Sequence, residues 1–307
     1  MAVYSIKDME KLSGIKAHTI RIWEQHYGLL QPKRTPTNIR YYEDEDLKLL
    51  LNVALLNKNG YRVSKISKMS EVEISEKVAE ISEVSYEYRT QLDALTLSMI
   101  EMDEFKFGRI INANTEQIGF ERTMLEVIYP FLDKLGILGM TGSVHPVQVN
   151  FISSLIRQKM IVAIDNLPLQ RNFANQKFLL YLPEGEKQEL SLLFLSFLLK
   201  SRGFQVIYAG VGVSLIDLKD AYRIQKPDFI YTMISEPFKK ISINNYVDTL
   251  AKNFSDIELL FSGYEVAVQK VKSRDNVRVL GSLEETIGFM EEVKERNQRT
   301  FAHSYRT

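Results

Sequence analysis

Residues 178–210 read FLLYLPEGEKQELSLLFLSFLLKSRGFQVIYAG, and this stretch decides the fold of the C-terminal half of the chain. It begins with an apolar run of strand length, passes through a polar turn at Gly185, and continues as an apolar helical segment that leads to a second apolar run. A strand, a helix and another strand in this order predict a βαβ unit, whose two strands are parallel. The polar turn would then lie outside the carboxyl end of the first strand, where ligands bind in such sheets.

The same alternation of apolar runs and amphipathic segments continues to residue 297. Residues 176–297 therefore predict a parallel sheet covered by helices on both faces. The Gly210-Val211-Gly212 sequence is interpreted as a strand-to-loop turn, because it lacks the third glycine of a dinucleotide-binding fingerprint. The candidate strands are 178–183, 205–210, 228–234, 257–263 and 277–281, and the candidate helices are 187–202, 214–225, 242–254 and 283–297.

Composition excludes several classes of protein. The 307 residues contain no cysteine, which excludes disulfides, thiolate nucleophiles, zinc ribbons and iron–sulfur clusters. The N-terminus MAVYSIKDME is charged where a signal peptide needs an apolar segment, and no uncharged apolar run approaches the roughly 18 residues of a membrane span. We therefore expect a cytoplasmic protein with no membrane partner.

The distribution of charged side chains points to a polyanionic partner. Lysine plus arginine and aspartate plus glutamate balance at 39 each, but residues 1–70 hold 12 basic and 7 acidic side chains, a surplus of five. A basic N-terminal domain on a neutral chain favours nucleic-acid binding. The four histidines lack metal-site spacing and no carboxylate pair suits acid–base catalysis, so neither a metal site nor an enzyme is predicted.

Residues 4–42 have the pattern of a helix-turn-helix with a wing. The segment IKDMEKLSG predicts a short helix that ends at Gly14, and KAHTIRIWEQHYG begins a second helix with Ile20 and Trp23 on its apolar side. Pro32 and Pro36 frame a short hairpin, the wing, whose basic side chains can reach phosphates. On shape and charge alone, a small helical protein-interaction domain with a basic surface is the alternative.

This segment closely resembles the MerR-type winged helix-turn-helix, on the following residues: Tyr4-Ser5-Ile6, Ser13-Gly14, Thr19-Ile20-Arg21, Trp23-Glu24, Gly28-Leu29-Leu30, Pro32, Arg34 and Arg40-Tyr41-Tyr42. The resemblance implies a DNA-binding domain over residues 1–73, with its second helix in the major groove of double-stranded DNA. Asn38 stands where the wing of the family often has glycine, and asparagine also adopts positive φ. The predicted DNA contacts are Lys16, His18, Thr19, Arg21, Tyr27, Arg34, Arg40 and Tyr41.

The rest of the chain resembles the cobalamin-binding region of photoreceptor-type repressors in the same family. The resemblance implies a four-helix cap over residues 80–170, a flavodoxin-like, doubly wound, five-stranded parallel sheet over residues 176–297, and a tail over residues 298–307. In the family the turn after the first strand reads [DE]-x-H-x-x-G, and its histidine coordinates cobalt. Here Glu186, Gln188 and Ser191 occupy the three positions. A carboxamide is a poor substitute for imidazole, because its nitrogen is not a usable donor and its oxygen is a weak, hard ligand.

The cap and the other strand ends are also altered. Gly139 stands at the tryptophan of the family, Val149-Asn150 replaces its Glu-His pair, and Ser262-Gly263 stands at its paired glycine. These substitutions together predict that cobalamin does not bind in the usual way. The predicted effector pocket, a degenerate cobalamin site, consists of Gly139, Val149, Asn150, Glu186, Gln188, Ser191 and Gly263, with no metal among them.

The sequence as a whole predicts a multidomain α and α/β protein that binds DNA as a homo-oligomer, dimer or tetramer, and regulates transcription. Its C-terminal module would sense an unknown small-molecule effector or serve as an oligomerisation domain, without a cofactor. Two alternatives remain: a light-responsive regulator that holds cobalamin in a histidine-free mode, and a corrinoid enzyme or carrier module.

Overall fold

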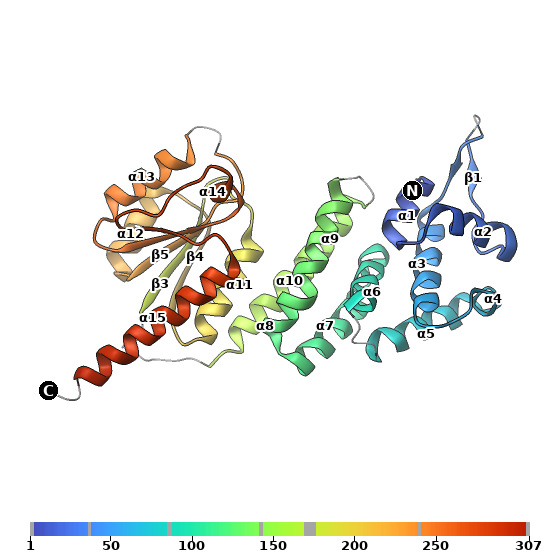
Figure 1. Ribbon diagram of the computed structural model, residues 1–307, viewed down its shortest axis with the longest axis horizontal. Helices are drawn as coiled ribbons and strands as arrows, with labels where there is room; N and C mark the ends of the chain where they lie inside the picture. The colour runs from blue at the N-terminus through green and yellow to red at the C-terminus, as the bar shows by residue number, and fades with distance from the viewer. Residues whose placement is uncertain are drawn as a thin grey trace. The chain divides into compact units, whose positions relative to one another are not determined.

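The computed structural model describes residues 3–35, 38–84, 88–140, 144–168, 176–238 and 241–304. The chain divides into two compact units, Met1–Leu155 and Ile156–Thr307, which are shown in Figure 1. The first unit combines the predicted DNA-binding domain with most of the predicted cap. Within the described residues, none of the helices combines the length and the apolar character needed to span a membrane.

The N-terminal helices begin and end where the sequence predicts. Ser5 and Asp8 form a reciprocal capping box at the start of α1, and Gly14 ends it with a φ of 71°. Gly28 ends α2 in the same left-handed conformation, with a φ of 62°. The elements of this region are α1 (Ile6–Ser13), α2 (Ala17–Tyr27), β1 (Lys33–Arg34), β2 (Arg40–Tyr41), α3 (Asp44–Lys58), α4 (Val63–Ile66) and α5 (Glu71–Val84).

The segment predicted as a four-helix cap consists mainly of helices. Its elements are α6 (Tyr88–Glu101), α7 (Glu104–Ile118), the continuous run of α8 (Phe120–Thr123), η1 (Met124–Ile128) and α9 (Tyr129–Met140), and α10 (Pro146–Asp165). In η1 the turn widens to a π-helix, and the N–H of Tyr129 reaches the carbonyl of Met124. Pro130 follows directly, and its ring would clash with the carbonyl four residues earlier in a regular α-helix, so the wider turn relieves this contact.

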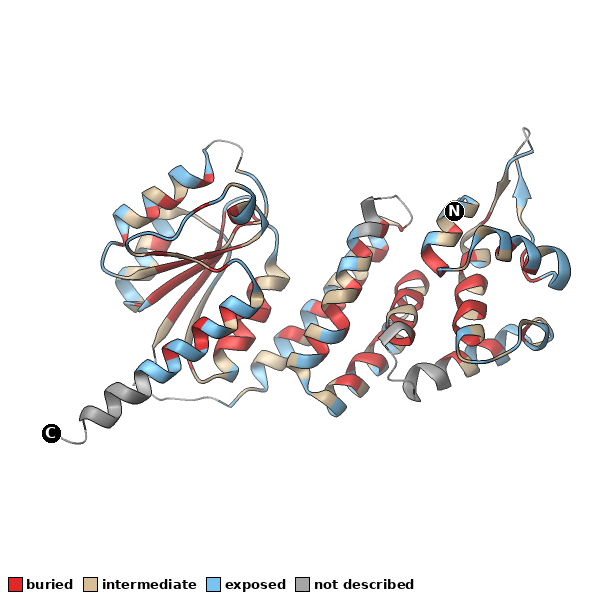
Figure 2. Ribbon diagram, in the orientation of Figure 1, coloured by how far each residue is buried: buried red, intermediate tan, exposed pale blue. Residues whose placement is uncertain are grey.

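The DNA-binding domain and the cap share one core in the first unit. Helix α3 is buried over most of its surface, as Figure 2 shows, which is typical of a helix at the centre of a domain. Asp93 of α6 accepts hydrogen bonds from Lys58 of α3 at 2.5 Å and from Lys134 of α9 at 3.3 Å. Burial lowers the pKa of Lys134 despite this carboxylate. One acidic side chain therefore ties the DNA-binding domain to two cap helices.

The second unit contains the predicted doubly wound sheet. Its five parallel strands have the order β4-β3-β5-β6-β7, so the chain adds β4 on one side of β3 and the later strands on the other. Helices α11, α12, α13 and α15 fall on the predicted segments. The elements are β3 (Lys177–Pro183), α11 (Glu189–Ser201), β4 (Gln205–Val213), α12 (Leu215–Gln225), β5 (Phe229–Met233), α13 (Ile243–Asn253), β6 (Glu258–Ser262), α14 (Tyr264–Val268), β7 (Val277–Val279) and α15 (Leu283–Ser304).

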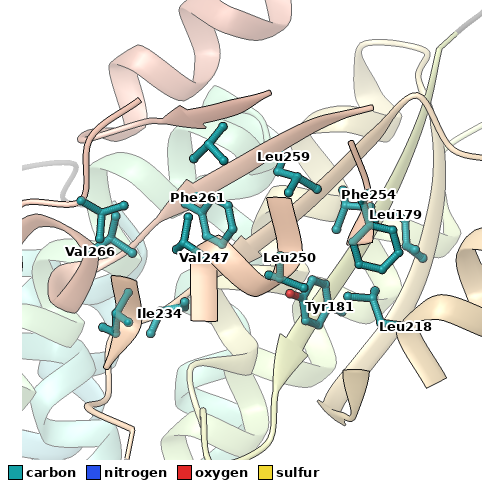
Figure 3. Packing of buried hydrophobic residues seen from close by; sticks show 14 residues of the cluster. Leu179, Tyr181, Leu218, Ile234, Val247, Leu250, Phe254, Leu259, Phe261 and Val266 are labelled. Carbon is teal, nitrogen blue, oxygen red and sulfur yellow. The ribbon is translucent and has the colours of Figure 1, made fainter. Parts of the chain in front are cut away.

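Both faces of the sheet are covered by apolar side chains. On one face Leu179, Tyr181 and Phe261 pack with side chains of α12 and α13, as Figure 3 shows. The hydroxyl of Tyr181 forms a hydrogen bond with that of Tyr246 at 2.9 Å, so the polar end of this ring has a partner in the core. On the other face the ring of Phe229 stacks on Phe178 of β3 at a centroid distance of 4.6 Å.

Two predictions need correction. The Gly210-Val211-Gly212 turn is part of β4: Gly210 and Gly212 have φ values of 88° and 70°, and the register with β3 shifts at these positions. The glycines therefore form bulges that let an edge strand continue past the irregularity. The tail predicted from residue 298 is helical as far as Ser304, because residues 289–304 contain neither glycine nor proline to end α15.

Gly263 should tolerate a side chain far less well than Gly185, although both have positive φ, 111° and 93°. A Cβ on Gly263 would lie 2.3 Å from the carbonyl oxygen of Ile234, whereas one on Gly185 meets nothing within 4 Å. We expect Gly263→Ala to lower the free energy of unfolding of the sheet domain by about 3 kcal/mol or more, and Gly185→Ala by about 1 kcal/mol.

Urea unfolding followed by far-ultraviolet circular dichroism measures this difference. The fluorescence of Trp23, the single tryptophan of the chain, reports the first unit and provides an internal control that should not change. Equal decreases in the free energy of unfolding of the two variants would contradict the close approach of the loop after β5 to Gly263.

Candidate nucleic-acid interface and sheet-edge site

The helix-turn-helix places most of the predicted DNA contacts on the solvent side of α2. Ile20 and Trp23 are buried against the rest of the domain, while Lys16, His18 and Arg21 are exposed and Thr19 is half-buried. Tyr27, at the end of the helix, is 40% exposed. Helix α2 thus presents a polar and cationic face while its apolar face fixes its position.

Lys16 also stabilises the turn between the two helices. Its Nζ lies 3.0 Å from Oε1 of Glu10, and the other oxygen of Glu10 accepts the N–H of Ala17 at 3.1 Å. These bonds lower the pKa of the Glu10 carboxyl group. Glu10 therefore caps α2 from α1, a role that the sequence pattern does not reveal because the residues are seven positions apart.

The wing is a short antiparallel hairpin in which Arg34 pairs with Arg40 and Lys33 with Tyr41. Asn38 adopts a φ of 64°, which confirms that asparagine provides the left-handed residue of the wing. Its side-chain oxygen accepts a hydrogen bond from Arg34 at 2.7 Å. Arg34 is exposed at the surface of the wing, and Tyr41 is half-buried.

Glu24 attaches the wing to the recognition helix. Its side chain is 12% exposed and accepts hydrogen bonds from Nε of Arg40 at 3.1 Å and from the hydroxyl of Tyr42 at 3.3 Å. Burial, together with Glu24, raises the pKa of Tyr42 to about 12. Glu24 matches the family pattern, but the sequence gives it no role. In the structure this carboxylate joins α2 to the wing.

At the edge of the sheet, Glu186 is the buried member of the predicted effector pocket. It is 5% exposed, and its carboxylate accepts the N–H groups of Lys187 at 2.8 Å and Gln188 at 3.0 Å, and of Ser235 at 2.6 Å and Glu236 at 3.0 Å. The side chain of Gln188 is exposed. The turn after β3 is therefore closed around its own acidic residue.

The remaining predicted pocket residues are distributed over both compact units. Gly139 lies on α9, while Val149 and Asn150 lie on α10, all within Met1–Leu155. Ser191 is half-buried in the first turn of α11, and Gly263 follows β6, both within Ile156–Thr307.

The residues after β3 do not fit a cobalt-binding role. Position 188 carries an amide, which supplies no imidazole-type nitrogen lone pair, and the neighbouring carboxylate of Glu186 is already used by backbone donors. Among the described residues, no group of three or more His, Asp or Glu side chains could hold a metal ion.

A separate cavity of about 690 Å³ lies along β4, between α11 and the last turns of α10. Leu193, Phe204 and Val206 contribute apolar side chains, and Arg157 and Glu189 form a two-bond ion pair, at 2.8 and 3.2 Å, beside it. Tyr208 also lines it, and the buried hydroxyl of this residue has no hydrogen-bond partner. The sequence gives no sign of this cavity, because residues from three elements build it.

Comparisons with known proteins agree with the N-terminal geometry. Residues 4–72 match the family described as MerR HTH family regulatory protein. The HTH-type transcriptional repressor CarH of Myxococcus xanthus is 26% identical over 233 residues, which are 74% of this chain and 77% of the repressor. The HTH-type transcriptional repressor CarA of the same organism is 26% identical over 227 residues, 73% of this chain and 74% of the repressor. The chain is a DNA-binding transcriptional regulator whose residues 4–72 form a MerR-type helix-turn-helix domain.

The regulator is also similar to solved structures. The monomethylamine corrinoid protein of Methanosarcina barkeri covers 72% of this chain and 99% of its own, with a TM-score of 0.46 and 13% identity. The MerR match ends at residue 72, so it includes α1 to α4, the wing and the start of α5. The helix-turn-helix of the regulator and its wing thus lie wholly inside the matched family region.

The bond between Arg40 and Glu24 should contribute measurably to the stability of the DNA-binding domain. In Arg40→Ala the largely buried carboxylate of Glu24 keeps only its hydrogen bond from the hydroxyl of Tyr42. We therefore expect the free energy of unfolding to fall by about 1–2 kcal/mol. Arg34→Ala removes only an exposed contact to Asn38 and should change stability by less than about 0.5 kcal/mol. Guanidinium unfolding followed by Trp23 fluorescence measures both, and equal effects would contradict the role given to Glu24.

Proposed function

We propose that the regulator binds duplex DNA as a homo-oligomer, dimer or tetramer, with α2 in the major groove and the wing on the phosphate backbone. The observation that carries this proposal is the clamp of Glu24 on Arg40 and Tyr42, which holds the wing and the recognition helix as one surface. Two copies of this surface on a two-fold axis would read two half-sites, as symmetric operators require.

The exposed side chains divide into two groups by their chemistry. Thr19, Arg21 and His18 lie on the recognition helix, where side chains meet base edges and give sequence specificity. Arg34 on the wing, with Tyr27, suits phosphate contacts that give affinity without specificity. Lys16 and Arg40 are held by Glu10 and Glu24, so we assign them to positioning the two elements and to backbone contacts.

We further propose that the cobalamin-binding-like C-terminal module senses a small molecule or mediates oligomerisation, without cobalamin. The side chains after β3 support the absence of cobalamin, because Gln188 stands at the position of the imidazole ligand and the carboxylate of Glu186 accepts four backbone N–H groups. The cavity beside β4 gives an effector an apolar wall and an ion pair to bind. The regulator would not be an enzyme, and it would act in the cytoplasm, where its DNA is.

Substitutions on the helix and the wing should affect DNA binding differently. With a duplex selected from a random library, Arg21→Ala should weaken the selected sequence by about 10- to 100-fold and leave unrelated duplexes nearly unchanged. Arg34→Ala should weaken all duplexes and reduce the slope of log K against log salt by about 0.9. Lys252→Ala, an exposed change on α13, is the control. Binding of both variants at the affinity of the unmodified protein would contradict this docking arrangement.

Cobalamin should not bind stoichiometrically. Titration with adenosylcobalamin and with methylcobalamin, in darkness and after illumination, should leave the corrin absorption spectrum as it is in buffer, because no residue after β3 provides an axial nitrogen. After gel filtration, the molar ratio of retained corrinoid to protein chain should be well below one. A stoichiometric spectral shift would instead favour the histidine-free cobalamin regulator, and methyl transfer by the bound corrinoid would favour a carrier.

A further inference from the structure

Two loops meet at the carboxyl ends of the neighbouring strands β3 and β5, where the order in which strands are added to the sheet reverses. Strands β3 and β5 are neighbours, yet the chain leaves β3 toward α11 and leaves β5 toward α13, which cover opposite faces. In doubly wound sheets, the crevice between two such loops is where ligands bind. In this chain the two loops begin with residues 184–188 and 234–238, and their backbones leave the strands at the same end of the sheet.

Glu186 spans this crevice from one loop to the other. Its Oε1 accepts the N–H groups of Lys187 and Gln188 in its own loop, at 2.8 and 3.0 Å. Its Oε2 accepts those of Ser235 and Glu236 in the opposite loop, at 2.6 and 3.0 Å. At 5% exposure, the side chain is nearly inaccessible to water.

The donors have the arrangement of an anion-binding site. Each loop contributes two consecutive N–H groups that converge on one oxygen, as in the backbone nests that bind phosphate and other anions. Hydrogen bonds from N–H groups to a charged carboxylate are stronger than those between neutral groups. A buried N–H without an acceptor is costly, so an anion that accepts these N–H groups stabilises the conformation of both loops.

We propose that the loops after β3 and β5 form a carboxylate-binding site, and that Glu186 occupies it as an internal ligand. A small carboxylate from solution takes the same place once the side chain is removed. In the unmodified protein an acidic ligand must displace Glu186 to enter the crevice. This inference goes beyond the proposed regulatory function and does not depend on it, since it involves neither DNA nor a second copy.

Replacement of the side chain tests the proposal directly. Glu186→Ala removes the carboxylate together with the methylene that carries it, which is the size of acetate. We expect this variant to lose several degrees in the melting temperature of the sheet domain, and acetate on the order of 0.1 M to restore most of the loss relative to chloride at equal ionic strength. The fluorescence of Trp23 should show no acetate effect on the first unit.

The controls separate a filled site from a general salt effect. Glu184→Ala removes an exposed carboxylate from the same loop and should lose little stability and gain nothing from acetate. Glu186→Gln keeps the volume of the side chain, so acetate should not stabilise it. Pivalate, which is too large for the vacated space, should not replace acetate. Equal stabilisation of all variants by acetate, or none of Glu186→Ala, would overturn the proposal.

A second measurement covers the case in which Glu186→Ala does not fold in chloride. Its refolding yield in acetate should then exceed the yield in chloride severalfold, and an equal yield would overturn the proposal. In the unmodified protein, nuclear magnetic resonance should show slow hydrogen exchange of the Ser235 and Glu236 amides. Glu186→Gln should accelerate that exchange, because an amide oxygen binds N–H groups less strongly than a carboxylate. Unchanged exchange would also overturn it.

Discussion

The loops at the carboxyl ends of β3 and β5 depend on the carboxylate of Glu186. A parallel sheet ends with backbone N–H groups that no neighbouring strand pairs, and they need a partner when loops bury them. Here one acidic side chain satisfies four such groups from two loops. It thereby fixes the loop that carries Gln188 and the loop that passes Gly263. The close contact between Ile234 and Gly263 then determines how tightly this edge is packed.

In the first unit, partly buried acidic side chains also join segments that are distant in the sequence. Glu24 joins the wing to the recognition helix, and Asp93 joins α3 to the cap helices through Lys58 and Lys134. Each acid contacts residues distant in sequence, so each converts separate helices and strands into one surface or one core. Asp93 and α3 therefore join the packing of the cap helices to that of the DNA-binding domain within the first unit.

In the sheet domain the backbone sets the fold, while any metal chemistry would depend on a few side chains. The parallel pairing and the helices on both faces follow from the alternation of apolar runs and amphipathic segments, whereas the strand order is seen only in the structure. The cobalt ligand that the family resemblance implies is an imidazole at one exposed position of one loop, and there the chain has an amide. A fold can persist through such a change because Gln188 contributes its backbone N–H, and not its side chain, to the loop.

The sequence by itself determined the parallel sheet and the helix-turn-helix with its wing, because these features depend on local periodicity, capping and turn chemistry. The four cap helices and the place of Asn38 in the wing were expected from the resemblance to the MerR-type family. The sequence predicted the rim around Glu186 but not the direction of that carboxylate, and it did not predict the bond from Glu24 to Arg40 or the cavity beside β4. The bulges at Gly210 and Gly212 and the continuation of α15 to Ser304 also differed from expectation. Only the tertiary structure decided these features, since the direction of a polar side chain depends on which unpaired backbone groups distant segments of the chain bring within hydrogen-bonding distance.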